Sequence, residues 1–318
     1  MVEMTAMSQS SFSRRDAIKL GAVAATAFAC APLQSVPSKS DALLTREIPS
    51  SGEALPLIGI GTARRYDVGA SAEERAPLRE VLRELPRLGG RLVDTAPSYG
   101  AAEGVVGELI AELGNRDEIF LATKVGAGRS GTEAGLAEMN ESFRRLRTNR
   151  LDLLQVHNLA GVDEMLPLLR KWKDEGRIRY LGVSTSSERQ YEALAALMRK
   201  EPLDFVQIDY AIDNRDADNV ILPLAADRGM AVLTNLPFGR GRVFEALGKH
   251  PMSEWARELG IATWAQFALK YVISHPAVTS AIPGTARLEY LKDNLGAARA
   301  PLPDARARQR MVQLLESA

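Results

Sequence analysis

Four side chains that can hold or transfer a proton lie at the ends of apolar runs in the first half of the chain. Asp94 follows the first of these runs, and Tyr99 stands five positions later on a Pro-Ser-Tyr-Gly turn. Lys124 and His157 occupy similar places in the next two runs. Taken singly, they could be a loop cap, a core ring, a snorkelling lysine and a satisfied core histidine. Their recurrence at three successive runs favours a common site instead.

Together these residue types can move a proton to or from an oxygen atom. A free tyrosine has a pKa of ~10, which is too high for efficient proton exchange near neutrality. A neighbouring ammonium group lowers that pKa, so Lys124 would activate Tyr99 while Asp94 keeps Lys124 charged and oriented. His157 would orient a carbonyl oxygen or relay a proton. None of the four carries a hydride, so an oxidoreductase built on them requires a cofactor.

The elements that must position these residues alternate regularly along the chain. Short apolar runs predict strands at 57–61, 91–95, 119–125, 151–156, 179–184, 204–209, 231–234 and 278–282. Helical patterns follow them at 76–88, 102–113, 133–146, 162–175, 188–199, 217–228, two runs ending at Ser274, 288–298 and 305–316. Alternation of strands with helices predicts a parallel sheet. Eight such units over roughly 250 residues fit an α/β fold of the closed (β/α)8 TIM-barrel type.

This barrel would gather the polar residues at one face, because catalytic groups of such barrels lie at the carboxyl ends of the strands. A hairpin is predicted before the barrel, at 47–56 around Ser51-Gly52, and extra helices are predicted at the C-terminus. An open doubly wound sheet is the alternative. The first strand is followed by Gly-Thr-Ala-Arg rather than a glycine-rich dinucleotide fingerprint, which argues against that alternative.

The first 45 residues are predicted to be a signal peptide and linker, with the barrel domain at 46–318. Arg14-Arg15 precede an uncharged, alanine-rich run from Gly21 to Ala31, which resembles a twin-arginine export signal. A cleavage site is available at Ala27-Phe28-Ala29. The expected location is therefore periplasmic or exported, with the twin-arginine machinery as a partner. The alternative is an N-terminal amphipathic helix on a cytoplasmic protein.

Composition excludes several classes of protein. The formal net charge is zero, with 46% hydrophobic and 25% charged residues, as in ordinary globular proteins, so neither nucleic acid nor, in the mature form, a membrane is an expected partner. The chain has 3 histidines, far apart, and 1 cysteine, Cys30, so no metal site is predicted. A disulfide within the chain is impossible with one cysteine.

The stretch from Leu57 to Asn294 resembles the aldo-keto reductase superfamily. Residues 94–100 match its Asp-Thr-Ala-x-x-Tyr-Gly signature, and residues 123–125 and 152–157 match the next two catalytic stretches. The resemblance implies Tyr99 as general acid/base. Asp94 and Lys124 would modulate it, and His157 would orient the substrate carbonyl.

The resemblance also implies a nicotinamide cofactor, with NADP(H) expected and NAD(H) the alternative. The implied cofactor-binding residues are Ser184, Thr185, Gln207, Asn235, Pro237, Gly239, Arg240, Gly241, Pro283, Gly284, Thr285, Arg287 and Asn294. Four positions depart from the common pattern: Thr185 replaces Asn, Asn235 replaces an aromatic residue, Gly284 replaces Lys and Tyr290 replaces Arg. Arg287 could meet a 2′-phosphate or be a solvated residue at the start of the last helices.

Two functions follow from these motifs. The first is reversible reduction of a small aldehyde or ketone to an alcohol by hydride transfer. The second is a cofactor-binding barrel that acts as a sensor or subunit with little turnover. The four proton-handling residues favour the first, since a pure binder has no need of Tyr99 and Lys124 together. Three aromatic residues, Tyr66, Phe238 and Phe244, are candidates to line the substrate pocket, with ordinary loop packing as the alternative.

Overall fold

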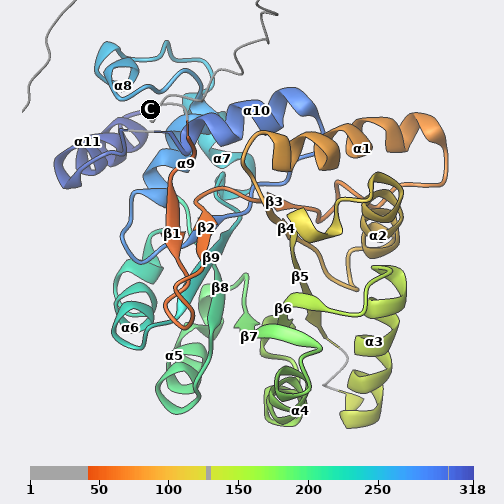
Figure 1. The fold of residues 1–318 in the computed structure, drawn as a ribbon. Helices are drawn as coiled ribbons and strands as arrows, with labels where there is room; N and C mark the ends of the chain where they lie inside the picture. The colour runs from red at the N-terminus through yellow and green to blue at the C-terminus, as the bar shows by residue number, and fades with distance from the viewer. Residues whose placement is uncertain (1–41, 127–129, 300) are drawn as a thin grey trace, which may run out of the picture. The chain divides into compact units, whose positions relative to one another are not determined.

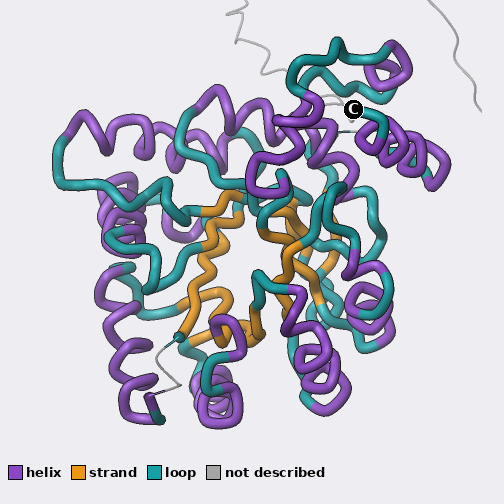
Figure 2. Tube along the Cα trace, turned by 180° about the vertical axis from the view of Figure 1, so that it is seen from behind, coloured by secondary structure: helices purple, strands orange, loops and turns teal. Residues whose placement is uncertain are grey.

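The structure is a computed structural model that describes residues 42–126, 130–299 and 301–318. Eight parallel strands pair in chain order, and helices surround them (Figures 1 and 2). The strands are β3 (Ile60–Gly61), β4 (Leu92–Asp94), β5 (Phe120–Val125), β6 (Leu151–Val156), β7 (Ile178–Ser184), β8 (Phe205–Asp209), β9 (Ala231–Asn235) and β10 (Ser280–Ala281). Parallel bridges between Ile58 and Ala281 and between Gly61 and Gly284 join the two ends of the sheet. The predicted (β/α)8 barrel is therefore confirmed.

The seam between β3 and β10 explains why these two strands are shorter than predicted. The backbone there still pairs, since the Gly59 N–H donates to the Ala281 carbonyl and the Ala281 N–H to the Leu57 carbonyl, both at 2.9 Å. A Cβ at Gly61 would lie 2.8 Å from the Ile282 carbonyl oxygen. Glycine at this position therefore permits the close approach that closes the barrel.

The helices follow the predicted order, except that three α-helices rather than the two predicted occur between β9 and Ser274. They are α1 (Ala72–Arg87), α2 (Ala102–Leu113), α3 (Thr132–Arg145), α4 (Val162–Asp174), α5 (Tyr191–Lys200), α6 (Ile221–Asp227), α7 (Arg242–Leu247), α8 (Glu254–Glu258), α9 (Trp264–Ile273), α10 (Leu288–Ala297) and α11 (Ala305–Glu316). Helix α1 begins four residues earlier than predicted, because Ser71 caps it by accepting the Glu74 N–H at 3.2 Å. Within the described residues, no helix is long and apolar enough to cross a membrane.

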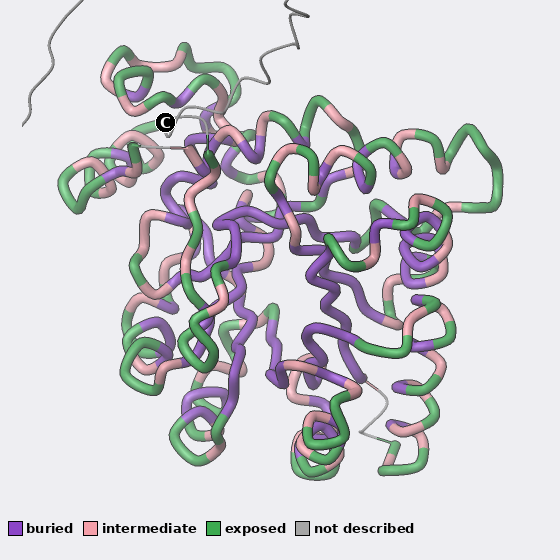
Figure 3. The backbone as a smooth tube through the Cα atoms, viewed as in Figure 1, coloured by how far each residue is buried: buried purple, intermediate pink, exposed green. Residues whose placement is uncertain are grey.

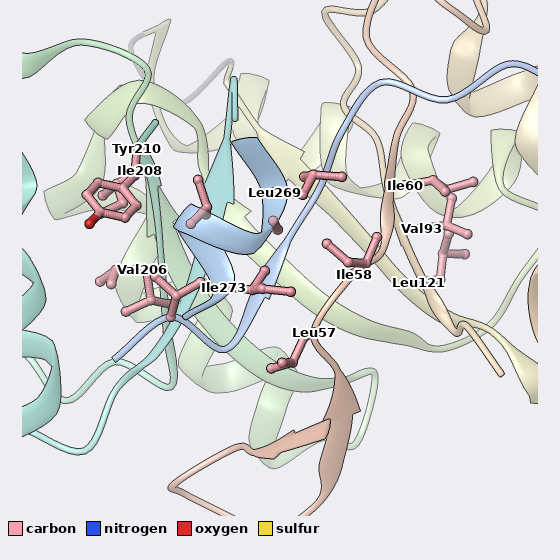
Figure 4. Close-up of a cluster of buried hydrophobic side chains, with 14 of the residues drawn as sticks. Leu57, Ile58, Ile60, Val93, Leu121, Val206, Ile208, Tyr210, Leu269 and Ile273 are labelled. Atoms are coloured by element: carbon pink, nitrogen blue, oxygen red, sulfur yellow. The ribbon is translucent and has the colours of Figure 1, made fainter. Parts of the chain in front are cut away.

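Two apolar layers hold the barrel. Side chains on the outer faces of the strands, such as Ile60, Val93 and Leu121, form part of one cluster with surrounding helices, including Leu269 and Ile273 of α9 (Figure 4). A smaller cluster fills the barrel interior and contains Ile48, Leu55, Leu92, Phe120, Ala122, Leu153, Tyr180, Phe205, Ala231, Leu233 and Ile282. The buried strands contrast with the exposed outer faces of the helices in Figure 3.

The predicted hairpin consists of β1 (Thr45–Glu47) and β2 (Ala54–Pro56), which pair antiparallel. Its Ile48 and Leu55 are fully buried and belong to the interior cluster, among side chains from the amino-terminal halves of the strands. The hairpin therefore plugs the amino-terminal end of the barrel and leaves the carboxyl end for the site. The expected export signal, with Cys30, lies outside the described residues.

Polar contacts fasten the same hairpin to the barrel wall. Arg179 of β7 pairs with Glu53 of the hairpin and donates to Asp152 of β6 at 2.9 Å. The Tyr180 hydroxyl donates to Glu53 at 2.8 Å and also contacts the Ser51 hydroxyl at 2.7 Å. One guanidinium thus joins the hairpin to two neighbouring strands.

We expect shortening of the Ile48 side chain to destabilise the fold in proportion to the volume removed. Ile48→Val should lower the free energy of unfolding by about 1 kcal/mol and Ile48→Ala by about 2–5 kcal/mol. The neighbouring side chains of the barrel interior cannot move in to fill the cavity that the shorter side chain leaves. Urea unfolding of both variants measures these values. Equal stability of the alanine variant and the wild type would contradict the interior position of Ile48.

Candidate active site

The carboxyl ends of three adjacent strands bring together the residues at which the sequence predicts proton chemistry. Asp94 ends β4, Lys124 lies next to the end of β5, and His157 directly follows β6. Strand β5 pairs with both β4 and β6, so neighbouring ends meet at one edge. Tyr99 lies on the turn between β4 and α2, with its ring edge-on to His157 at 5.9 Å.

Asp94 and Lys124 form a buried ion pair in which every donor of the ammonium group is used. Lys124 Nζ donates to Asp94 Oδ1 at 2.8 Å, to Asp94 Oδ2 at 2.7 Å and to the Thr95 carbonyl oxygen at 2.9 Å. The two side chains are only 1% and 3% exposed. Because these hydrogen bonds pair both charged groups, the two charges can remain inside the protein.

Lys124 is also the neighbour of Tyr99, with Nζ 5.1 Å from the ring centroid. Burial disfavours the charged form of Lys124, but the charge and hydrogen bonds of Asp94, with Tyr99 beside them, outweigh burial and raise the Lys124 pKa. Burial raises the pKa of Asp94, and the Lys124 charge and hydrogen bonds from Lys124 and Gln207 oppose that rise. Lys124 is therefore an ammonium at neutral pH.

The pKa of Tyr99 corrects one expectation from the sequence. Lys124 does lower it, but burial raises it more, and the Asp94 charge adds to the rise. The net shift is upward rather than toward neutrality, because the phenolate loses its hydration inside the site. Tyr99 is thus a protonated phenol next to a fixed positive charge, which suits a proton donor.

His157 is neutral at physiological pH. Burial and the positive charge of Lys124 lower its pKa from 6.5 to about 4. Its Nδ1 lies 3.4 Å from the Ser98 hydroxyl, on the same turn as Tyr99. A neutral imidazole can donate one hydrogen bond to an oxygen atom without competing with Tyr99 as an acid.

Gln207, predicted from the resemblance, lies on β8 and connects this cluster to a residue that sequence analysis missed. Its Oε1 accepts a 2.9 Å hydrogen bond from Gln155 Nε2, so its own amide N–H groups are left to face Asp94. Gln155 lies on β6, is fully buried, and points to the same side of the chain as His157 two positions later. Gln155 could have been found from the sequence, because it is a glutamine inside a mostly apolar strand.

Three more predicted residues gather at the ends of β7 and β9. Ser184 is 2% exposed, and its hydroxyl accepts the Asn158 N–H at 3.4 Å. Asn235 Nδ2 donates to the Thr185 carbonyl oxygen at 3.2 Å. Within the described part of the chain, Asn235 Oδ1 is buried and accepts no hydrogen bond, so it is an available acceptor.

The Leu-Pro-Phe-Gly-Arg-Gly loop after β9 contains Pro237 and the three predicted pyrophosphate residues. Gly239, Arg240 and Gly241 all have positive φ, at 57°, 59° and 106°. A Cβ at Gly239 would lie 2.1 Å from Asp213 Oδ2, so glycine is needed here to make room for the Asp213 carboxylate. Asp213 was not predicted, and it also pairs with Arg242 at 2.7 Å.

The last predicted segment follows β10. Thr285 Oγ1 donates to the Pro283 carbonyl oxygen at 2.9 Å, and Asn294 Nδ2 donates to Thr285 Oγ1 at 3.1 Å. Both side chains are buried and hold the loop in place.

Gly284 and Tyr290, which depart from the common family pattern, lie in and beside this segment. Arg287 is exposed, 3.7 Å from Glu289, and its guanidinium lies 5.9 Å from the Tyr290 ring. Gly284 lies against Arg65, whose Nε is 3.6 Å from where a Cβ would stand.

The aromatic candidates for the pocket divide into two cases. Tyr66 is fully buried and belongs to the core, so the idea that it lines an open pocket is wrong. Phe238 and Phe244 pack on each other with centroids 5.0 Å apart, and Phe244 is 39% exposed. No group of metal-binding side chains occurs among residues 42–126, 130–299 and 301–318.

We predict that His157 makes the fold less stable in mild acid. Its pKa is about 4 in the folded protein against 6.5 in the unfolded chain, so the unfolded state binds the additional proton as pH falls from about 6.5 to about 4. Through this pKa shift, His157 should lower the free energy of unfolding by about 2 kcal/mol as the pH falls from 7 to 5. Urea unfolding of His157→Gln should show a smaller loss over that interval, whereas a variant at the exposed His250 should behave as the wild type. Identical losses in all three proteins would refute the shift.

Comparison with known proteins identifies the family. A model of the Aldo/keto reductase family matches residues 57–310. Methylglyoxal reductase YeaE of Escherichia coli is 31% identical over 265 residues, which is 81% of this chain and 91% of that protein.

Solved structures agree with this match. An aldo-keto reductase of Klebsiella pneumoniae in complex with NADPH has a TM-score of 0.71 and 28% identity, covering 86% of this chain and 95% of that one. Aldo-keto reductase AKR11C1 of Bacillus halodurans, in its holo form, has a TM-score of 0.69 and 26% identity, covering 87% and 97%. Since the family model spans most of the sequence and the structure is the same barrel, the chain belongs to the aldo/keto reductase family.

Proposed function

We propose that the protein reduces an aldehyde or ketone to an alcohol, with NADPH as the hydride donor and Tyr99 as the proton donor. The observation that carries this proposal is the buried ammonium of Lys124, held by both oxygens of Asp94 and 5.1 Å from the Tyr99 ring. The reductase activity named for the Escherichia coli relative and the NADPH bound by the Klebsiella structure support it.

Residues at the carboxyl ends of β7, β8 and β9 fit a nicotinamide. NADPH, when bound, supplies the hydride, and this chain must hold its ring beside Tyr99. Ser184, Thr185 and Gln207 would bind the carboxamide with Asn235, whose Oδ1 is a buried acceptor without a partner in the described chain. A carboxamide N–H₂ group is a matching donor. Hydrogen bonding by Asn235 would then take the place of aromatic stacking.

The loop after β9 fits a pyrophosphate. Gly239, Arg240 and Gly241 combine backbone N–H groups with one cation, and all three have positive φ. The adenosine end would lie by the segment after β10, with Arg287 as the cation for a 2′-phosphate. Asn294 and Thr285 would shape that segment, with Pro283 and Gly284 contributing backbone.

The proton step follows from the shifted pKa of Tyr99. Because burial keeps the phenol protonated, it can donate its proton to the carbonyl oxygen as that oxygen gains negative charge. The resulting phenolate is stabilised by Lys124, and Asp94 keeps Lys124 charged and in place. In the reverse direction the phenolate accepts the proton of the alcohol.

His157 would orient the substrate rather than exchange protons with it. Its pKa of about 4 makes it neutral, and Ser98 lies at its Nδ1. Its other nitrogen is then left to donate to the carbonyl oxygen, which fixes that oxygen between His157 and Tyr99.

We predict that Tyr99→Phe abolishes turnover and leaves cofactor affinity nearly unchanged, because only the proton donor is removed. Loss of a general acid costs about 10²–10⁴-fold in rate. The measurement is kcat with a panel of aldehydes, ketones and sugars, together with NADPH and NADH dissociation constants from protein fluorescence. Tyr180→Phe is the matched control, since it deletes a hydroxyl that contacts Glu53 and Ser51 of the hairpin at the opposite end of the barrel.

Two outcomes would overturn the proposal. Wild-type rates in Tyr99→Phe would exclude Tyr99 as the proton donor. Tight cofactor binding by the wild type without turnover of any carbonyl would favour a sensor or subunit instead.

Export by the twin-arginine route is a separate part of the proposal. It is supported by Arg14-Arg15 and the apolar run that follows them, outside the described residues. This route carries folded proteins, so we infer that a cofactor held tightly by the barrel would travel with it. N-terminal sequencing of the protein from its native cell should find a mature N-terminus that lies after Ala29 and within the first 45 residues. An intact N-terminus on the cytoplasmic protein would refute export.

A further inference from the structure

The turn that carries Tyr99 is held by a carboxylate from a distant part of the chain. Asp67 belongs to the loop between β3 and α1, and its Oδ1 accepts the Ala101 N–H at 2.9 Å. Ala101 is the first residue before α2, and its own side chain cannot cap the helix. Asp67 thus supplies from another loop the acceptor that this helix start lacks.

Gly100 makes this contact possible. Its φ is +63°, and a Cβ there would lie 2.2 Å from Asp67 Oδ1 and 2.5 Å from Oδ2. The carboxylate therefore occupies the space that any larger residue would fill, directly next to Tyr99. Glycine at this position is required both for the positive φ and for the approach of Asp67.

The loop that carries Asp67 is itself anchored to the site. Thr62 donates both its N–H and its hydroxyl to the Asp94 carbonyl oxygen, each at 3.0 Å. Tyr66, immediately before Asp67, is fully buried in the core and donates its N–H to the Thr62 carbonyl at 3.0 Å. The carboxylate is therefore presented from a fixed backbone rather than from a free loop.

Tyr99 depends on its turn for position. Its N–H donates to the Ala96 carbonyl at 3.1 Å, and its carbonyl accepts the Ala102 N–H at 3.2 Å. The bond from Ala101 to Asp67 lies between these contacts and ties the turn to the loop between β3 and α1. A displacement of the turn would move the phenol relative to Lys124 and His157.

We propose that Asp67 is a positioning residue for Tyr99, acting through Gly100 and Ala101. This inference rests on the proposed function, in which Tyr99 donates the proton. Displacement of a reacting group by about 1 Å can cost about 10²-fold in rate. Asp67→Ala should therefore lower kcat by about 10- to 100-fold while KM for the carbonyl and the NADPH dissociation constant stay close to wild type.

Two further variants make the test specific to the contact. Asp67→Asn keeps an oxygen acceptor of the same shape and should restore kcat to within about three-fold of wild type. Gly100→Ala pushes a methyl group into the carboxylate and should also lower kcat. The double variant of Asp67→Ala with Gly100→Ala should lose no more than the worse single variant, because both disrupt one contact.

A matched control separates positioning from simple helix capping. Asp304 is exposed like Asp67 and caps α11, where its Oδ1 accepts the Ala307 N–H at 2.7 Å. Asp304→Ala should lower the melting temperature as Asp67→Ala does, with wild-type kcat. If Asp67→Ala also keeps wild-type kcat, Asp67 is a helix cap only and the proposal is wrong.

The result does not depend on finding a good substrate. Amide hydrogen exchange across residues 96–102 should speed up in Asp67→Ala and stay slow in Asp67→Asn. A wild type that turns over no carbonyl refutes the proposed function, whereas unchanged exchange in Asp67→Ala refutes the positioning. The two failures are therefore distinguishable.

Discussion

The buried ion pair between Asp94 and Lys124 is the interaction on which the rest of the site depends. Both side chains are almost fully inaccessible, and an unpaired charge in such a place costs about 3–5 kcal/mol or more. The two strands that carry the pair must therefore stay in register, and the Thr95 carbonyl must face the third N–H of the ammonium. The barrel supplies this register through parallel pairing of β4 with β5, and the hairpin plug at the opposite end keeps that pairing packed.

The Asp94–Lys124 pair also influences the pKa of Tyr99. Burial alone would make the phenol a very weak acid, and the ammonium offsets part of that effect. Burial and the same positive charge lower the pKa of His157, so the two groups proposed to face a substrate oxygen would differ in role. Tyr99 would act as an acid, and His157 as a neutral hydrogen-bond donor. Burial thus has the largest effect on both neighbours, and the charge of Lys124 opposes it at Tyr99 and adds to it at His157.

Strands and loops divide the work of the site. Asp94, Lys124 and Gln155 belong to strands, so their positions follow from sheet geometry. Tyr99 and the Gly239–Gly241 segment lie on turns, and each turn has a carboxylate from another loop packed against a glycine of positive φ. Asp67 meets Gly100, and Asp213 meets Gly239. This arrangement gives flexible turns a defined geometry without a large side chain near the reacting atoms.

The sequence by itself determined the barrel, the hairpin and the four proton-handling residues. Period and composition mark the buried strands, and charged groups that interrupt them stand out because their burial is costly. Tertiary structure alone decided which side chains meet across loops, as in Asp67 with Gly100 and Gln155 with Gln207. It also decided that Tyr66 belongs to the core and that the Tyr99 pKa rises. Burial and contact between distant segments arise from the packing of the whole barrel, so no local pattern in the sequence encodes them.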